Sequence, residues 1–315
     1  MENFKKYWDR FGTLGMLLVI GIGLSIASPR FFLTVNNITQ IGVQSTIFLL
    51  LALGVFFAIL IAGIDLSVGA IAGLTGMLTA MMMTSGVSVP LALLLGLVFS
   101  ICFGAINGML INITELHPFV ITLGTQAIFR GVTLIISDGR PVFNLPQSFR
   151  GIAGFVGGIP IPIIITGVIA IILAFFTKHT VLGRNIYALG GNKQSAWYSG
   201  INIKKHTLIV HSISGLMAGF AGIVMTARIG AAEPLAGQGL ETFAIAACII
   251  GGTSFFGGKG KIFGVVMGGL IIATISNGLN ILNVPSFWQQ VVMGSLIIGA
   301  VALDKLIGGA AGKKA

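Results

Sequence analysis

The sequence predicts an all-α, polytopic membrane protein of about ten transmembrane helices, and composition, segment length and charge placement each support this fold class. Hydrophobic residues make up 55% of the 315 positions, and charged residues only 8%. A soluble domain carries about a quarter charged residues, because water must cover its surface. The missing charged surface indicates that lipid surrounds the protein, and we expect residues 1–315 to form a single transmembrane domain.

Apolar segments recur along the whole chain, and most contain about 20 residues, which is long enough to cross the hydrocarbon core of a bilayer. The third and the eighth are short and rich in glycine. Two substantial loops, 137–158 and 178–206, interrupt the series, and the other connections are tight turns. The predicted segments are 12–28, 38–62, 66–84, 89–111, 118–136, 159–177, 207–227, 241–256, 264–283 and 287–307.

The 18 lysine and arginine residues are distributed unevenly between the two sides of the predicted bundle. Cytoplasmic loops of membrane proteins are enriched in basic residues. We therefore place the N-terminus in the cytoplasm, and ten crossings return the C-terminus there, in a multi-pass protein of the inner membrane. The residues then inside are Lys5, Lys6, Arg10, Lys178, Arg184, Lys193, Lys204, Lys205, Lys259, Lys261, Lys305, Lys313 and Lys314, those outside are Arg30, Arg140, Arg150 and Arg228, and Arg130 lies within the fifth segment.

The net charge of +10 does not predict nucleic-acid binding, because the basic residues are scattered along short loops and form no patch interleaved with aromatic residues. The lipid bilayer is the expected surrounding instead. The alternating topology gives segments 2–5 and 7–10 opposite orientations. This is compatible with an inverted repeat, a common arrangement in transport folds, although the two halves show no clear match of residues.

The cytoplasmic loop 178–206 contains a predicted short helix, at about 192–199, between two glycine-containing turns. Asn192 is a suitable N-cap, and Gly200 suits a left-handed stop at the C-terminal end. Two helical turns are only marginally stable in water by themselves. We therefore expect another molecule to stabilise this helix.

The same stretch favours a docking helix that lies in a groove on a partner protein, although an ordinary cytoplasmic loop is the alternative. In the docking interpretation, Ala196 is the point of close contact, and Trp197 and Tyr198 are amphipathic anchors. A helix that binds in a groove uses one face of this kind.

Four stretches of the chain together resemble one known family, the ribose-type sugar permeases, which are membrane subunits of bacterial ATP-driven (ABC) importers. The similarity runs from about residue 30 to residue 303, in the same order as in the family. The stretches are Leu182–Asn192 with Ala196–Asn202, Ala62–Gly69 (AGIDLSVG), Thr122–Gly124 followed by Arg130–Gly131 and Gly139–Pro141, and Gly251–Gly260 (GGTSFFGGKG).

This resemblance implies a ten-helix permease that forms a homodimer, or a heterodimer with a related permease. It also implies two separate ATP-binding ATPase subunits on the cytoplasmic side and a sugar-binding protein on the periplasmic side. Members of the family differ in their sugar, such as ribose, allose, xylose or galactose. The implied ATPase contacts are Gly190, Gly191, Asn192, Ala196, Trp197, Tyr198, Ser199 and Gly200.

The sequence contains no motif that would let the chain use a nucleotide by itself. The closest match to a phosphate-binding P-loop, Gly257–Gly260, lacks the hydroxyl residue after Lys259 and has Thr253 where the first glycine belongs. The histidines are spread out, and no group of residues has catalytic or metal-ligand spacing. We therefore expect no enzymatic activity, no metal and no cofactor, with ATP bound by the partner ATPase.

Two ionisable residues, Asp65 and Arg130, lie within or beside apolar segments, where a charge is costly and often marks a function or a structural pair. Asp65 stands at a glycine-rich break, where its carboxylate would cap the next helix; direct contact with a sugar is the alternative. Arg130 is expected to pair with a carboxylate or with carbonyl groups, and a direct role in transport is again the alternative.

A pathway for a sugar needs polar groups that bind hydroxyls only weakly, because the solute must leave again. For any one of these groups, however, the favoured role is a hydrogen bond between helices, and contact with the sugar is the alternative. Besides Asp65 and Arg130, the candidates are Asn107, Thr122, Gln126, Asn277, Asn280, Gln289 and Gln290.

The outer loop 137–158 is the longest on its side and is the predicted docking surface for a periplasmic binding protein, through Arg140 and Arg150. Elsewhere, four Gly-x-x-x-Gly pairs within apolar segments predict close helix packing. These pairs are Gly69/Gly73, Gly104/Gly108, Gly215/Gly219 and Gly264/Gly268.

Three other interpretations compete with a sugar importer. An ion-driven secondary transporter would favour paired carboxylates or a polar cluster at the membrane midplane, and the sequence offers only Asp65 near one interface. A membrane enzyme would need clustered titratable residues. An ATP-driven importer could also carry another small polar solute, such as a furanose-type signalling molecule.

Overall fold

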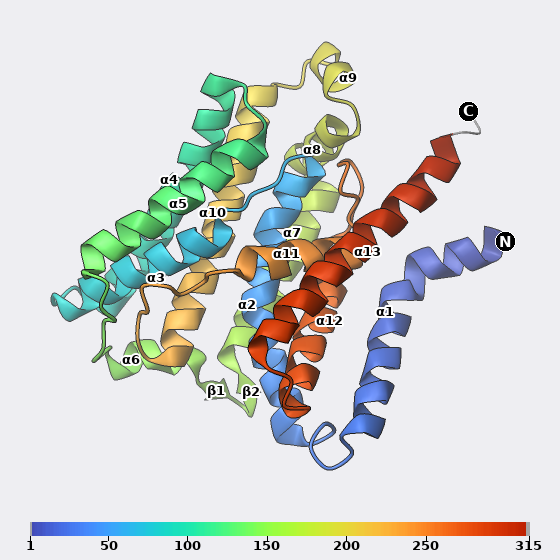
Figure 1. Ribbon diagram of the computed structural model, residues 1–315. Coiled ribbons are helices and arrows are strands. Elements are labelled where there is room, and N and C mark those ends of the chain that lie inside the picture. The colour runs from blue at the N-terminus through green and yellow to red at the C-terminus, as the bar shows by residue number, and fades with distance from the viewer. Residues whose placement is uncertain (1, 313–315) are drawn as a thin grey trace.

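The computed structural model describes residues 2–312, and helices make up most of that length (Figure 1). The all-α fold class is confirmed. In chain order, the elements are α1 (Glu2–Ala27), α2 (Val35–Leu60), α3 (Val68–Thr84), α4 (Val89–Thr114), α5 (Pro118–Ser137), α6 (Gln147–Arg150), the 3₁₀ turn η1 (Gly151–Ala153), β1 (Phe155–Val156), β2 (Ile159–Pro160), α7 (Ile161–His179), α8 (Val181–Gly191), α9 (Lys193–Tyr198), α10 (Ile203–Ile229), α11 (Leu240–Ile250), α12 (Ile262–Ile281) and α13 (Ser286–Gly312).

Three helices, α2, α10 and α12, form the centre of the bundle, and α4, α5 and α7 lie at its periphery. In the most apolar stretch of α2, 89% of the residues are buried, against 22% in each of α4 and α5. A peripheral helix with apolar side chains facing outward suits lipid or a second protein as its neighbour. The fraction of buried residues therefore distinguishes the helices that form the core of the bundle from the helices whose outward faces contact lipid or a second protein.

Within the part of the chain that the structure describes, six helices are long and apolar enough to cross a membrane: α2, α4, α5, α7, α10 and α12. Four shorter apolar helical stretches accompany them, at residues 12–27, 68–84, 240–250 and 287–299. The predicted segment 241–256 is wrong as a continuous crossing, because α11 ends at Ile250. Its 11 residues span roughly 16 Å at 1.5 Å per residue, about half of the hydrocarbon core.

The chain is broken between helices at two places within the bundle, residues 61–67 before α3 and residues 230–239 before α11. The two breaks meet where α3 begins: a side chain at Gly69 would collide with the carbonyl oxygen of Gly237, and one at Gly237 with that of Gly69. Discontinuous helices are common at the binding sites of transporters. Several of the polar residues described below lie in these breaks or bind their backbone.

Close glycine packing, predicted from the four Gly-x-x-x-Gly pairs, is confirmed. Gly104 of α4 and Gly215 of α10 face each other, so that a Cβ on either would meet the backbone of the other. Gly264 and Gly268 of α12 similarly lie against the backbone of α11 and of Gly251. Such contacts bring helix axes close enough for dispersion forces to hold them in lipid.

The loop 178–206, which the sequence predicts to be cytoplasmic, contains more structure than the single short helix predicted there. Helix α9 lies where it was expected, but α8 precedes it, over a stretch whose three glycines are unfavourable for a helix. Tertiary packing outweighs this cost, because Ile186 and Leu189 are buried, and Gly183 lies against the backbone of Phe176 and Thr177.

The loop 137–158, which the sequence predicts to face outward and which we call the outer lobe, is a small folded unit at the opposite end of the bundle from α8 and α9 (Figure 1). It contains α6, η1 and the β1 strand, which pairs with β2 through the Gly157-Gly158 turn. Positive φ at both glycines, 57° and 81°, suits the tight two-residue turn of a hairpin. Leu145 and Phe149 are buried under the lobe.

Candidate functional site

Helix α9 presents two aromatic side chains to its surroundings. The Asn192 side chain accepts a hydrogen bond from the Ser195 N–H at 2.8 Å, and Gly200 ends the helix with φ of 81°. Trp197 and Tyr198 are 60% and 72% exposed, whereas Ala196 is only 4% exposed. In this structure Ala196 therefore packs inward, and the aromatic pair forms the surface open to a partner.

Helix α8 connects α9 to the membrane bundle through backbone contacts at Gly190. A side chain at Gly190 would collide with the carbonyl oxygen of Leu60, the last residue of α2. The same carbonyl accepts a hydrogen bond from the Gly258 N–H at 2.9 Å. One backbone atom at the end of α2 therefore joins α8 to the loop 251–261, which links α11 and α12.

Tyr187 adds a second link between α8 and this loop. Its hydroxyl donates a hydrogen bond to the Gly260 carbonyl at 2.9 Å. Burial raises the pKa of Tyr187, so the phenol stays protonated and able to donate throughout the physiological range. Movement of α9 would thus reach α2, α11 and α12 through α8.

At the first break, Asp65 is fully buried and accepts three hydrogen bonds. Its Oδ1 accepts from the Ser67 N–H at 3.0 Å and from the Ser67 hydroxyl at 2.6 Å, and its Oδ2 accepts from the Ser214 hydroxyl of α10 at 2.7 Å. The Asn107 side chain of α4 donates to the Ser67 hydroxyl at 2.7 Å. The carboxylate therefore ties the start of α3 to α4 and α10.

Thr122 of α5 forms hydrogen bonds with backbone groups of the same break. Its hydroxyl donates to the Ile64 carbonyl at 2.9 Å and accepts from the Leu66 N–H at 3.2 Å. Unwound backbone in lipid needs such partners, because water is not available there. Asp65, Asn107 and Thr122 thus lie together around one break.

Arg130 and Gln126, also on α5, hold the second break. Arg130 Nη1 donates to the carbonyls of Ala236 at 2.6 Å and Pro234 at 3.3 Å, so the predicted pairing with carbonyl groups is present. Gln126 donates to Glu241 Oε1 at 2.9 Å. Sequence reasoning missed Glu241, although a carboxylate within an apolar segment is the kind of signal that singled out Asp65.

One face of α5 joins the two breaks. Thr122, Gln126 and Arg130 are spaced four residues apart, so their side chains lie above one another along about 12 Å of helix. Among the described residues, Glu241 Oε2 is buried with no hydrogen-bond partner. This face is the one continuous polar line that the predicted pathway residues form.

The remaining pathway candidates lie apart from that line, at the C-terminal end of α12 and the start of α13. Asn277 donates to Asn37 at 2.9 Å, and Gln289 donates to Asn280 at 2.7 Å. Asn280 also lines an open pocket of about 420 Å³ with Asn37. Gln290 is exposed. The structure therefore does not bring all nine predicted residues together.

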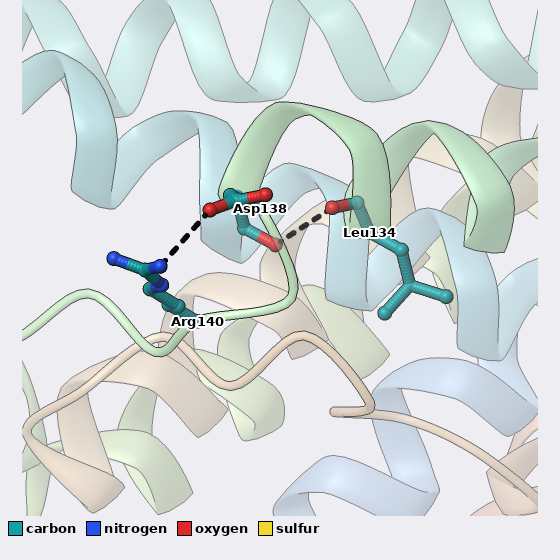
Figure 2. Close-up of polar contacts among 4 residues, drawn as sticks. Leu134, Asp138 and Arg140 are labelled. Atoms are coloured by element: carbon teal, nitrogen blue, oxygen red, sulfur yellow. Dashed lines mark hydrogen bonds and ion pairs between the residues drawn. The ribbon is translucent and has the colours of Figure 1, made fainter.

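On the outer lobe, Arg140 and Arg150 are both exposed. Arg140 forms an ion pair with Asp138 at 3.4 Å, just beyond the end of α5 (Figure 2), and both side chains are more than 80% exposed. Such a pair is weak in water. Either arginine is therefore free to bind a partner.

Comparison with known proteins identifies the family. A family described as "Branched-chain amino acid transport system / permease component" matches residues 37–301. The chain belongs to this family. No solved structure matches it.

Several relatives of this permease-family chain are similar to it over nearly their whole length. The D-allose transport system permease protein of Escherichia coli (strain K12) is 60% identical, over 97% of this chain and 94% of the relative. The ribose import permease protein of Bacillus subtilis (strain 168) is 42% identical, over 96% and 95%. The xylose transport system permease protein of Haemophilus influenzae is 33% identical, over 92% and 95%.

The resemblance to the ribose-type sugar permeases is thereby confirmed, and this permease is a multi-pass protein of the inner membrane. Its family consists of transport subunits, which agrees with the expectation of a transport role. The relatives' names refer to sugars, whereas the family description refers to branched-chain amino acids. The similarity to individual relatives is therefore more informative about the solute than the family description.

Proposed function

We propose that this chain is the permease subunit of an ATP-driven importer that moves a monosaccharide of the allose or ribose type from the periplasm to the cytoplasm. The 60% identity to a D-allose transport permease carries this proposal. A separate ATPase subunit binds and hydrolyses the ATP, and a periplasmic binding protein delivers the sugar. Two copies of the chain, or one copy and a related permease, form the complete pathway.

In this proposal the chain crosses the membrane ten times, with α3 and the 230–250 segment as its short crossings, and both termini lie in the cytoplasm. Helices α8 and α9 then lie on the cytoplasmic side, where Trp197 and Tyr198 bind the ATPase. The outer lobe faces the periplasm. The two breaks, one after α2 and one after α10, fit an inverted repeat of the two halves.

The polar face of α5 is proposed to line the pathway. Thr122, Gln126 and Arg130 follow one another along this helix, and Glu241 offers an unpaired carboxylate oxygen beside them. Much of the rest of α5 is exposed apolar surface, which a second copy would cover. The sugar would then pass along the line between the two copies.

An ion-driven transporter and an importer of another small polar solute are the alternatives, and uptake by proteoliposomes separates them. We expect a purified complex of permease and ATPase, with the binding protein added outside, to accumulate D-allose or D-ribose only when ATP is enclosed. A protonophore should leave uptake unchanged. ATP-independent accumulation by the permease alone, or collapse of uptake with the protonophore, would contradict the proposal; uptake of neither sugar would exclude these two solutes.

Reversing both arginines of the outer lobe, Arg140→Glu with Arg150→Glu, is expected to lower the association rate of the binding protein about tenfold at low salt. Charges at the edge of an interface mainly steer encounter. Surface plasmon resonance at two salt concentrations would measure this rate. The matched control reverses Arg30, which lies outside the lobe; an equal effect there would contradict docking at the lobe.

A further inference from the structure

The segment between α10 and α11, residues 230–239, is irregular backbone within the bundle. Three of its glycines, Gly230, Gly237 and Gly239, have φ between 75° and 79°, a conformation that other residues rarely adopt. The short helix α11 follows directly. Changes of φ and ψ at a few such positions are sufficient for a hinge motion.

The outer lobe holds this segment at its outer end. Val142 and Ala232 pair as an isolated β-bridge, in which each N–H donates to the other residue's carbonyl at 3.0 Å. The lobe is firmly packed at this point, because Leu145 and Phe149 are buried in a cluster that includes Ala232 and two residues of α10, Ile223 and Ala227. A displacement of the lobe would therefore move residue 232.

Helices α3 and α5 hold the same segment at its inner end. Arg130 binds the carbonyls of Pro234 and Ala236, and Gly237 lies directly against Gly69. These are contacts to backbone atoms, so they fix the path of the segment and do not depend on its side chains. The segment thus extends from the outer lobe to the polar face of α5.

We propose that residues 231–239 form the outer gate of the sugar pathway, and that the outer lobe is the lever through which a sugar-loaded binding protein opens it. The lobe offers exposed apolar side chains at Phe143 and Phe155, beside Arg140 and Arg150, for a soluble partner to cover. Docking displaces the lobe, the Val142–Ala232 bridge carries the displacement, and the glycine hinges let the segment leave α3 and α5. This inference rests on the proposed function.

The test weakens the bridge and leaves unchanged the exposed side chains proposed for docking, Arg140, Phe143, Arg150 and Phe155. Val142→Pro removes the N–H that donates to Ala232, and Val142→Ala is the matched control because it keeps both hydrogen bonds. Ala232→Pro removes the N–H of Ala232, which donates to the Val142 carbonyl, and leaves the sequence of the lobe unchanged. For each variant, reconstituted with the ATPase, we would measure the affinity of the binding protein and its stimulation of ATP hydrolysis.

We expect the two proline variants to bind the binding protein within about twofold of the parent's affinity, and to lose at least about fivefold of its stimulation. Val142→Ala should behave as the parent does. Retained stimulation in both proline variants would overturn the inference, as would loss of affinity together with stimulation in both. The parent complex tests the proposed function separately, because its ATP-dependent uptake does not depend on the bridge variants.

Discussion

Replacing Gly190 with alanine is expected to lower sugar uptake at least about tenfold, whereas the same change at Gly191 leaves uptake close to that of the parent. A methyl group at Gly190 would overlap the Leu60 carbonyl oxygen and approach the Gly258 N–H, both of which are backbone atoms. Forced overpacking costs about 1–3 kcal/mol, and each 1.4 kcal/mol is a factor of ten in an equilibrium. The substitution therefore separates α8 from the end of α2.

Gly191 is a closely matched control, because it is the next residue in the same helix and a Cβ there meets no described atom within 4 Å. The measurement is ATP-dependent uptake in proteoliposomes, with ATP hydrolysis by the assembled complex recorded in parallel. We expect the Gly190→Ala complex to retain its ATPase, since Trp197 and Tyr198 are unchanged, but to lose stimulation by the sugar-loaded binding protein. Equal uptake by the two variants would contradict transmission through α8.

The helical bundle could be predicted because lipid imposes a simple pattern on the sequence. Long apolar segments such as 89–111 and 118–136 became α4 and α5 with ends shifted by only a few residues. The pattern failed for 241–256, where apolar composition continues past the helix end at Ile250 into a glycine-rich loop. Hydropathy measures the surroundings of a segment and not its backbone conformation, so it could not locate that end.

The stretch 178–206 shows the opposite error. Its glycines predicted turns, but Gly183 and Gly190 lie within α8, where they allow close approach to other backbone segments. Local propensity could not predict this, because the backbone atoms that these glycines approach belong to Phe176, seven residues before Gly183, and to Leu60, far away in sequence. The short α9 was predictable, since its Asn192 cap and Gly200 stop are local signals.

The polar residues could be predicted as a set but not as an arrangement. Asp65 and Arg130 stood out because charges in lipid are rare; Asp65 lies at one break in the helices, and Arg130 of α5 binds the backbone of the other. Apart from Ser67, which is close to Asp65 in sequence, their partners are Ser214 and the carbonyls of residues 234 and 236, more than 100 positions away in the chain. Without the fold, no spacing rule distinguishes these partners from Asn277 or Gln289, which bind elsewhere.

Removing the carboxylate of Asp65 is the second change with a large expected effect. Asp65→Ala leaves the Ser67 N–H, the Ser67 hydroxyl and the Ser214 hydroxyl without their acceptor in a fully buried position. Hydrogen bonds to a charged group contribute about 1.5–3 kcal/mol each, and part of this loss is recovered when the hydroxyls rotate to other acceptors. We therefore expect the free energy of unfolding to fall by roughly 2–4 kcal/mol.

Asp65→Asn keeps the shape of the side chain and removes its negative charge. The amide oxygen still accepts from Ser67, and the amide nitrogen donates to the Ser214 hydroxyl, which can act as an acceptor. We expect this variant to lose about 1 kcal/mol or less and to retain most of its uptake, because the tie between α3 and α10 persists. Unfolding in mixed detergent, followed by tryptophan fluorescence, would compare the three proteins. If Asp65→Asn abolished uptake while its stability stayed near that of the parent, the charge itself would act in transport, and a purely structural role for Asp65 would be wrong.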